Sequence, residues 1–355
     1  MTAARVRRWL RSLRGVALVC CAGGAVGWAG AQGLQGSFGG SDLPPISSVG
    51  PQERDVGAWL QRLQQASRVP SYVGTFVVSS IGGAMSSARI WHVCEGDVQM
   101  ERVEALSGTP RSIFRRNDAV VTFLPESHTV RTERREVGGA FPNLFAAGAL
   151  GSTADFYEAR QLGQGRVAGL DADVVVFSPA DKLRFGYRIW SEKRTGMVLK
   201  TQTFDALGRV LEQAAFSELQ LDAPIKSASL QRMMRSTQGY RVEKYARVPT
   251  TADAEGWSQK APVPGFKPQN CYRGAAGAPA QAVQWIFSDG LATVSLFMEP
   301  FDSQRHVNEG AAALGATHTV VKHLSLEGSD WWVTAVGEVP VPTLRLFIDS
   351  LQRRK

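Results

Sequence analysis

The sequence predicts an α+β protein of two domains: a curled antiparallel half-barrel sheet covered by helices, followed by a smaller α+β C-terminal domain. Three observations favour this fold. The chain has 355 residues, more than the roughly 100–200 residues of one typical domain. Short strand-like segments follow one another without helices between them, which is typical of an antiparallel sheet. A second group of such segments follows a polar stretch at residues 221–253.

The first 31 residues have the layout of a secretory signal peptide. Arginines precede an uncharged apolar stretch from Gly15 to Ala31, which ends in Ala29-Gly30-Ala31. We expect cleavage before Gln32 and export. An uncleaved membrane anchor is the alternative, but about 17 residues interrupted by glycines are short for a span. Residues 32–50 are rich in Gly, Ser and Pro, which indicates a flexible leader.

The charge of the chain is concentrated in this leading segment. The whole sequence has a formal net charge of +8, and five of its positive charges are Arg5, Arg7, Arg8, Arg11 and Arg14. A mature chain that starts at Gln32 would therefore carry +3. Nucleic-acid binding requires a dense basic surface, so a nearly balanced exported protein is not expected to bind nucleic acid.

The large domain is assigned to residues 51–220. A helix is predicted after Asp55 and before Pro70, because apolar residues follow the spacing of one helix face at Val56, Trp59, Leu60 and Leu63. Short β-branched and aromatic segments then predict strands over Ser71–Ser79, Ala88–Cys94, Ala119–Leu124, Ala172–Phe177, Leu183–Trp190, Met197–Phe204 and Val210–Phe216. The first helix and a helical stretch near Phe141–Leu150 are available to cover this sheet.

The second domain is assigned to residues 254–355, after a predicted linker at 221–253. Strands are expected over Ala282–Phe287, Ala292–Glu299, His318–Ser325 and Asp330–Val336. A final helix is predicted with Thr343 as its N-cap and with Leu344, Phe347, Ile348 and Leu351 on one face. We expect Arg353, Arg354 and Lys355 at its carbonyl end, where positive charge is favourable.

No enzyme is predicted. The sequence lacks G-x-S-x-G, H-E-x-x-H, C-x-x-C and the P-loop, and it indicates no cofactor. Two H-x-x-E pairs, His92 with Glu95 and His306 with Glu309, are weak metal candidates, because such short patterns occur readily by chance.

Binding features are better supported than catalytic ones. The strands at Ser71–Ser79 and Leu183–Trp190 carry apolar residues on both faces. One reading is a half-barrel with an apolar pocket for acyl chains or an apolar peptide, and the other is an ordinary sandwich core. The pocket hypothesis predicts apolar contacts from Tyr72, Phe76, Trp91, Phe185, Tyr187 and Trp190.

Arginines form two groups, Arg111, Arg115 and Arg116, and then Arg131, Arg134 and Arg135. Such groups bind phosphate or carboxylate groups, but they also occur on solvated strand edges where charge prevents aggregation. For an anionic ligand we predict contacts from Arg89, Arg111 and Arg184.

The two cysteines of the mature chain, Cys94 and Cys271, leave two alternatives open. A disulfide between them would persist in an oxidising compartment and would tie the two halves of the chain together. Alternatively, Cys94 is a buried small hydrophobe on its strand. The sequence favours the unbridged form, because sequence separation does not show that the two Cα atoms approach.

The order of motifs resembles the MucB/RseB family of periplasmic negative regulators of an envelope-stress sigma factor. The resemblance rests on Trp59-Leu60-Gln61-Arg62, Tyr72-Val73-Gly74-Thr75-Phe76-Val77, Arg89-Ile90-Trp91-His92, Leu183-Arg184-Phe185-Gly186-Tyr187-Arg188, Pro264-Gly265-Phe266, Phe287-Ser288-Asp289-Gly290-Leu291-Ala292 and Val336-Gly337-Glu338-Val339-Pro340. It implies a LolA-like N-terminal domain. Cys94, Cys271 and the long leader depart from the family pattern.

The resemblance also implies a function. The protein would bind the periplasmic segment of a membrane-spanning anti-sigma factor and protect it from site-1 proteolysis, until lipopolysaccharide or a related acylated lipid released it. A periplasmic lipid or lipoprotein carrier is the alternative. The oligomeric state stays open, a homo-oligomer included.

Overall fold

The computed structural model describes residues 56–66, 71–134, 153–274 and 281–354. The predicted signal peptide and leader, Asp55, Pro70 and the helical stretch near Phe141–Leu150 lie outside these ranges. Within them, no helix has the length and apolar character needed to cross a lipid bilayer.

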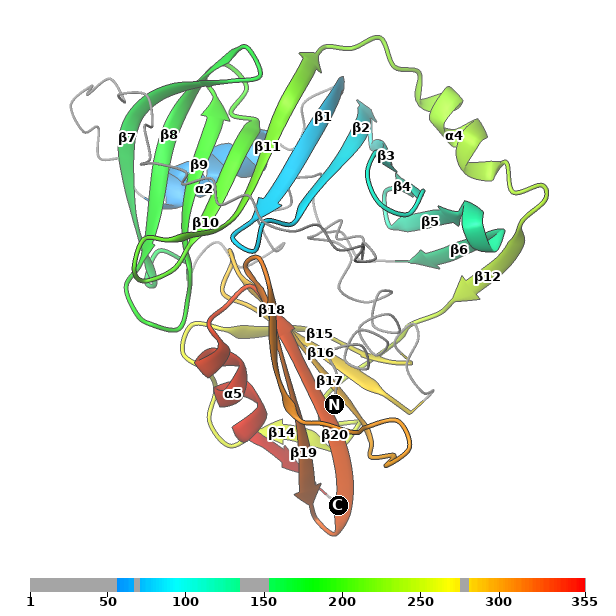
Figure 1. Cartoon of the computed structure of the whole chain (residues 1–355), viewed down its shortest axis with the longest axis vertical. Coiled ribbons are helices and arrows are strands. Elements are labelled where there is room, and N and C mark those ends of the chain that lie inside the picture. The colour runs from blue at the N-terminus through cyan, green and yellow to red at the C-terminus, as the bar shows by residue number, and fades with distance from the viewer. Residues whose placement is uncertain (1–55, 67–70, 135–152, 275–280, 355) are drawn as a thin grey trace, which may run out of the picture.

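A twelve-stranded sheet forms the N-terminal part, in the order β12-β6-β5-β4-β3-β2-β1-β11-β10-β9-β8-β7. It curls but does not close, since β12 and β7 remain its edges (Figure 1). Neighbouring strands are antiparallel except β12 and β6, which are parallel. The strands are β1 (Ser71–Ser80), β2 (Met85–Glu95), β3 (Val98–Ala105), β4 (Ser112–Arg116), β5 (Ala119–Leu124), β6 (Thr129–Arg134), β7 (Tyr157–Val167), β8 (Leu170–Pro179), β9 (Gly186–Glu192), β10 (Val198–Phe204), β11 (Val210–Leu221) and β12 (Arg241–Tyr245). A 3-10 turn, η3 (Pro125–Ser127), joins β5 to β6.

Two helices pack on opposite faces of this sheet. Helix α2 (Val56–Gln65) buries Trp59, Leu60 and Leu63 against β7–β10. Helix α4 (Ser227–Arg235) buries Leu230 and Met234 against β2–β6. Directly paired residues of neighbouring strands share a face, so the registers trace both faces across the sheet. We call the side of the sheet that packs on α2 the α2 face, and the opposite side, which packs on α4, the α4 face. The expected curled sheet is confirmed, and helices cover part of each face.

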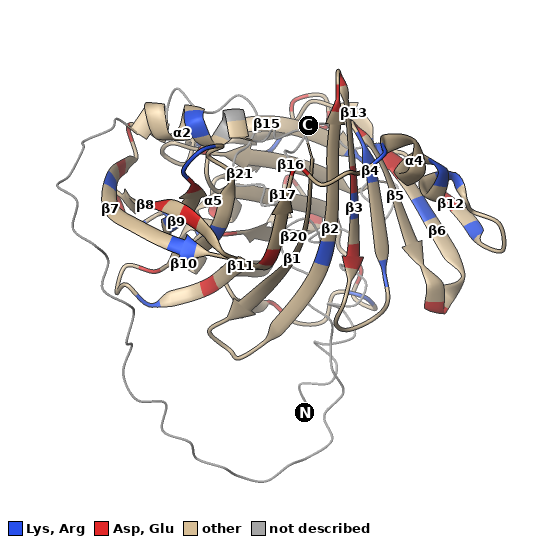
Figure 2. Ribbon diagram, turned by 90° about the horizontal axis from the view of Figure 1, so that it is seen from above, with Lys and Arg blue, Asp and Glu red and all other residues tan. Residues whose placement is uncertain are grey.

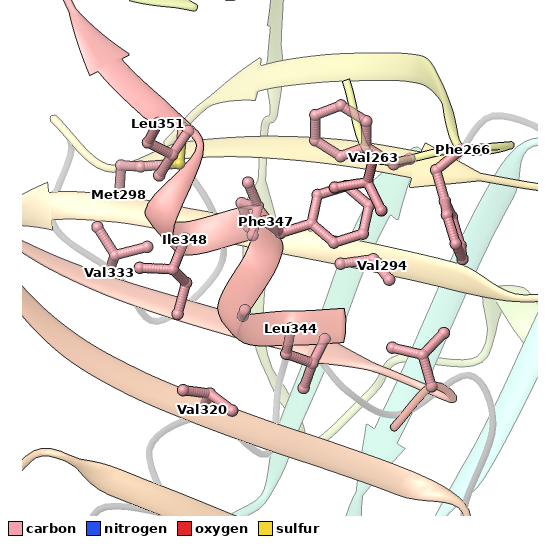
Figure 3. Packing of buried hydrophobic residues seen from close by; sticks show 14 of the residues in the cluster. Val263, Phe266, Val294, Met298, Val320, Val333, Leu344, Phe347, Ile348 and Leu351 are labelled. Carbon is pink, nitrogen blue, oxygen red and sulfur yellow. The ribbon is translucent and has the colours of Figure 1, made fainter. Parts of the chain in front are cut away.

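The C-terminal part has a seven-stranded antiparallel sheet, in the order β13-β15-β16-β17-β20-β19-β18. Helix α5 (Val341–Asp349) packs on it, and Figure 3 shows Leu344, Phe347 and Ile348 among Val294, Val320 and Val333. The strands are β13 (Val248–Thr250), β15 (Lys267–Arg273), β16 (Val283–Ser288), β17 (Thr293–Pro300), β18 (Gly310–Leu314), β19 (Thr317–Leu326) and β20 (Ser329–Gly337). Two short strands, β14 (Trp257–Gln259) and β21 (Leu351–Arg353), pair beside it.

The final helix differs from the prediction. It begins at Val341 rather than after Thr343: Pro340 is its N-cap, and Pro342 lies in its first turn, where proline is tolerated. Thr343 therefore lies inside the helix, where its hydroxyl donates to the Leu183 carbonyl at 2.9 Å. The helix ends at Asp349, and Leu351 and Arg353 belong to β21. Of the basic residues expected at the carbonyl end of the helix, Arg353 therefore lies in β21, which pairs with β14.

The segment predicted as a linker contributes to both sheets. It contains α4, then β12 beside β6, and then β13 beside β15. The chain therefore leaves the large sheet only after Tyr245 and enters the small one at Val248.

Candidate binding site

The first two predicted contacts, Tyr72 and Phe76, lie on the α2 face of β1. Both side chains are buried, and each meets the ring of Phe216 edge to face with ring centroids 6.2 Å apart. Gly74 lies between them, and a Cβ atom there would meet the Phe216 ring at 2.7 Å. Glycine is thus required for this ring to cross β1, and Tyr72 and Phe76 form part of the sheet's core.

The α2 face continues across β3–β6 as a row of directly paired residues: Val103, Ile113, Thr122 and Arg131. All four are half-buried, unlike the core beneath α2. Arg131 pairs with Glu243 of β12 at 3.5 Å, and its guanidinium lies 5.5 Å from the Tyr245 ring centroid. We call these four residues the β3–β6 surface; it combines apolar contact area with a partly exposed positive charge.

A polar row runs beside the β3–β6 surface on the same face. Tyr72, His92, Glu101 and Arg115 are paired directly across β1–β4. His92 Nδ1 lies 3.0 Å from Glu101 Oε1, and Arg115 Nη1 lies 3.9 Å from Glu101 Oε2. His92 and Glu101 are buried, and each ionisable group in the row has a charged or polar neighbour.

Tyr187 also points to the α2 face, but it lies beneath α2. Its ring belongs to the buried cluster formed by Trp59, Leu60 and the strands β7–β10, and only 2% of the residue is exposed. Tyr187 thus packs between sheet and helix, at a distance from the β3–β6 surface along the strand order.

Arg89, Trp91 and Trp190 point to the α4 face. The guanidinium groups of Arg89 and Arg102 both contact the Trp91 ring, at 5.5 and 4.7 Å from its centroid. Trp190 contacts the Lys200 ammonium at 4.5 Å, and burial, with Arg188 nearby, lowers the pKa of Lys200. The tryptophans predicted to join Tyr72 in one pocket therefore lie on the other side of the sheet.

Arg184 and Phe185 lie at the contact between the two domains. Arg184 Nε donates to Asp289 Oδ2 at 2.7 Å, and Nη2 donates to the Pro264 carbonyl at 2.5 Å. Its guanidinium carbon lies 4.3 Å from the Phe156 ring centroid and 4.9 Å from that of Phe266, and the side chain is fully buried. Arg184 does meet an anionic group, as the sequence suggested, but it is a carboxylate of the same chain.

Asp289 is the centre of this contact. It also accepts hydrogen bonds from the Tyr157 hydroxyl at 3.2 Å and from the backbone N–H groups of Leu291 and Ala292. Burial raises the pKa of its carboxyl, and the backbone N–H groups and Arg184 act in the opposite direction. Nearby, Phe185 packs edge to face on His318 with centroids 5.4 Å apart. These two predicted contacts thus hold the domains together.

Arg111 is half-buried just before β4, and burial lowers the pKa of its guanidinium. Figure 2 shows further Lys and Arg residues at this end of the sheet, on β4, β6, β12 and α4. They include Arg115, Arg116, Arg131 and Arg134 from the two predicted groups, whereas Arg135 lies outside the described residues. Positive charge therefore flanks the β3–β6 surface.

Sequence reasoning missed the partners of the histidines. His92 pairs with Glu101 rather than Glu95, whose carboxylate instead accepts from Ser227 at the start of α4. His306 pairs with Glu299 at 3.1 Å, not with Glu309. In the described part of the chain, no group of three His, Cys, Asp or Glu residues is arranged to hold a metal ion. The sequence signal for a partner of His92 was the i, i+2 spacing of His92 and Cys94, since two residues at this spacing share one face of a strand.

Cys94 and Cys271 are both free thiols in the structure. Cys94 lies on β2 of the large sheet and Cys271 on β15 of the small one. The unbridged alternative matches this arrangement, so the domains are joined by the Arg184 contact and not by a disulfide between these two residues.

Comparison with known families is consistent with this two-part organisation. The model of the MucB/RseB N-terminal domain matches residues 55–234, and that of the MucB/RseB C-terminal domain matches residues 251–352. The chain belongs to the MucB/RseB family. The resemblance noted from the sequence motifs is thereby confirmed. The first range contains the large sheet except β12, and the second contains the small sheet except β13 together with α5.

Individual members of the MucB/RseB family are similar over most of their length. The sigma factor AlgU regulatory protein MucB of Pseudomonas aeruginosa is 29% identical over 305 residues, which cover 82% of this chain and 89% of that protein. The sigma-E factor regulatory protein RseB of Haemophilus influenzae is 23% identical over 316 residues, covering 88% and 95%. A solved complex of Pseudomonas aeruginosa MucA/MucB matches with a TM-score of 0.66 at 26% identity, covering 85% of this chain and 100% of that chain.

Proposed function

We propose that this protein is a periplasmic regulator that binds the periplasmic segment of a membrane-spanning anti-sigma factor. The observation that carries the proposal is the family match over both domains, together with the similarity to MucB in a solved MucA/MucB complex. In this proposal the bound segment is protected from site-1 proteolysis, and lipopolysaccharide or a related lipid releases it.

The β3–β6 surface is the part of the sheet best suited to an amphipathic peptide. Val103 and Ile113 offer half-buried apolar area, and Arg131 and Arg115 lie beside it on the same face. A segment with apolar residues on one side and acidic residues on the other would bury the first and pair the second. A peptide held against a sheet is less accessible to a protease than a free one.

Competition would couple lipid binding to peptide release. Acyl chains require the same apolar contacts as the peptide, and lipid phosphate groups require the same guanidinium groups, with Arg111 as a further candidate. If the two ligands exclude one another, each lowers the affinity for the other by the same factor. No catalytic step is needed for such a response.

Calorimetric titration tests the proposal. The mature chain, residues 32–355, is titrated with the periplasmic segment of the anti-sigma factor from the same organism, with and without lipopolysaccharide. We expect binding that weakens as lipopolysaccharide is added. No binding in either condition would overturn the regulatory function, and transfer of lipid between vesicles would then test the carrier hypothesis. Binding that lipid leaves unchanged would retain the partner but reject the release step.

A further inference from the structure

Cys94 belongs to an ordered cluster on the α2 face. Its Sγ atom lies 3.2 Å from His92 Nε2, and the other ring nitrogen of His92, Nδ1, lies 3.0 Å from Glu101 Oε1. A nucleophile, a base within hydrogen-bond distance and a third group that orients the base form the arrangement that activates cysteine for covalent chemistry. We propose that Cys94 is a reactive thiol that exchanges with small-molecule disulfides and becomes covalently modified.

The surroundings of His92 fix its orientation. The Tyr72 ring is stacked on the imidazole, with centroids 4.7 Å apart and an interplanar angle of 15°. Glu101 in turn is held by Gln99 at 3.5 Å and by Arg115 at 3.9 Å. The imidazole is fully buried, whereas Cys94 is half-buried at the end of β2. The base is therefore fixed in place while the sulfur retains access to small reagents.

The ionisable groups around the pair favour a protonated imidazole. Burial by itself lowers the pKa of His92, but the hydrogen bonds with Cys94 and Glu101 raise it to about 9. Burial and the nearby Glu101 and Cys94 raise the pKa of Tyr72, so its phenol stays neutral. A doubly protonated ring donates one N–H to Glu101 and the other to the Cys94 sulfur, and a cation beside a thiol favours its thiolate form. The thiolate is the nucleophilic form of cysteine.

The exchange step is balanced without any further reagent. The Cys94 thiolate attacks one sulfur of a disulfide RS–SR, the bond between the two sulfurs breaks, and a mixed disulfide Cys94–SR forms. The departing RS⁻ takes a proton from His92 or from water and leaves as the thiol RSH. Cys94 is thereby oxidised and half of the small disulfide is reduced. Such reagents fit an oxidising compartment, where disulfides persist.

Cys271 provides a control within the same molecule. It is buried on β15, and burial, with Glu255 nearby, raises the pKa of its thiol to about 11. Cys271 should therefore resist exchange under conditions in which Cys94 reacts.

The test measures adduct formation on residues 32–355 with oxidised glutathione, mapped by mass spectrometry from pH 5.5 to 9. We expect Cys94 to react at least tenfold faster than Cys271. His92→Gln should lower the Cys94 rate about tenfold, because the N–H donor beside the sulfur is lost. Glu101→Gln should give an intermediate rate, because His92 then loses its carboxylate partner.

Circular dichroism checks that each variant keeps its fold. If His92→Gln does not fold, the ratio of the Cys94 and Cys271 rates in the unsubstituted chain decides alone. A Cys94 rate no faster than that of Cys271, or one that folded His92→Gln leaves unchanged, would overturn the proposal.

Discussion

Arg184 of the large domain and Asp289 of the small domain form an ion pair with Nε and Oδ2 2.7 Å apart, and neither side chain is exposed to solvent. The charges are 105 residues apart in sequence. Gly265 allows the guanidinium to approach, because its φ is +79° and a Cβ there would overlap both Arg184 and the Phe156 ring. The two domains thus meet at a contact that leaves little room for adjustment.

Removing Arg184 should destabilise the protein. Arg184→Leu leaves the Asp289 carboxylate buried without its ion-pair partner, which typically costs about 3–5 kcal/mol. Urea unfolding measures the loss. Arg194→Leu is the control, because the Arg194–Asp222 pair is largely exposed and should contribute at most about 1 kcal/mol. Equal effects of both substitutions would contradict a structural role for the buried pair.

The core beneath α5 should depend on the inward face of that helix. Phe347 is fully buried against Phe266 and Phe287, so Phe347→Ala should cost about 3–5 kcal/mol of folding free energy. Leu346 precedes it in the same helix and is 46% exposed, so Leu346→Ala should cost far less. Thermal unfolding of both variants compares them, and similar melting temperatures would refute the predicted packing.

The His92 cluster should make stability depend on pH. Its folded pKa of about 9 lies above the ordinary value of 6.5. The folded state thus binds this proton more tightly, and the associated stability is present below pH 6.5 and lost as pH rises toward 9. The change should be on the order of 3 kcal/mol. Unfolding free energies at pH 6.5 and 9 measure it, with His92→Gln as reference; identical pH profiles for both proteins would reject the assignment.

Peptide binding should be sensitive to charge on one face only. Thr122 of β5 lies on the α2 face within the β3–β6 surface, whereas Thr132 of β6 pairs with Val121 on the α4 face. Both are half-buried threonines on neighbouring strands. Thr122→Glu should weaken binding of the anti-sigma segment tenfold or more, and Thr132→Glu should leave it nearly unchanged. Calorimetry compares the affinities of the two variants for the anti-sigma segment. A larger loss of affinity in Thr132→Glu than in Thr122→Glu would place the partner on the α4 face.

Much of the fold was predictable because local pattern and local structure agree. Helix α2 has its apolar residues at the predicted positions, and the predicted strands with long apolar runs correspond to β1, β2, β5, β8–β11, β16, β17, β19 and β20. The strands that were missed are β3, β4, β6, β7, β12–β15, β18 and β21. In β3, β4 and β6, residues such as Glu101, Arg115 and Arg131 interrupt the apolar pattern, and only pairing with neighbouring strands gives these charges their partners.

The sequence by itself determined the family, the two-domain order and the elements with long apolar runs, because these depend on motifs and on periodicity along the chain. Only the tertiary structure decided which face each side chain meets. Tyr72 and Trp91 were expected in one pocket, yet they alternate to opposite faces of the sheet. Arg184 was expected to meet a ligand, yet its partner is Asp289. A charge that is buried on folding requires a compensating charge nearby. For Arg184 that charge is Asp289, which is distant in sequence and is brought close only by the packing of the two domains.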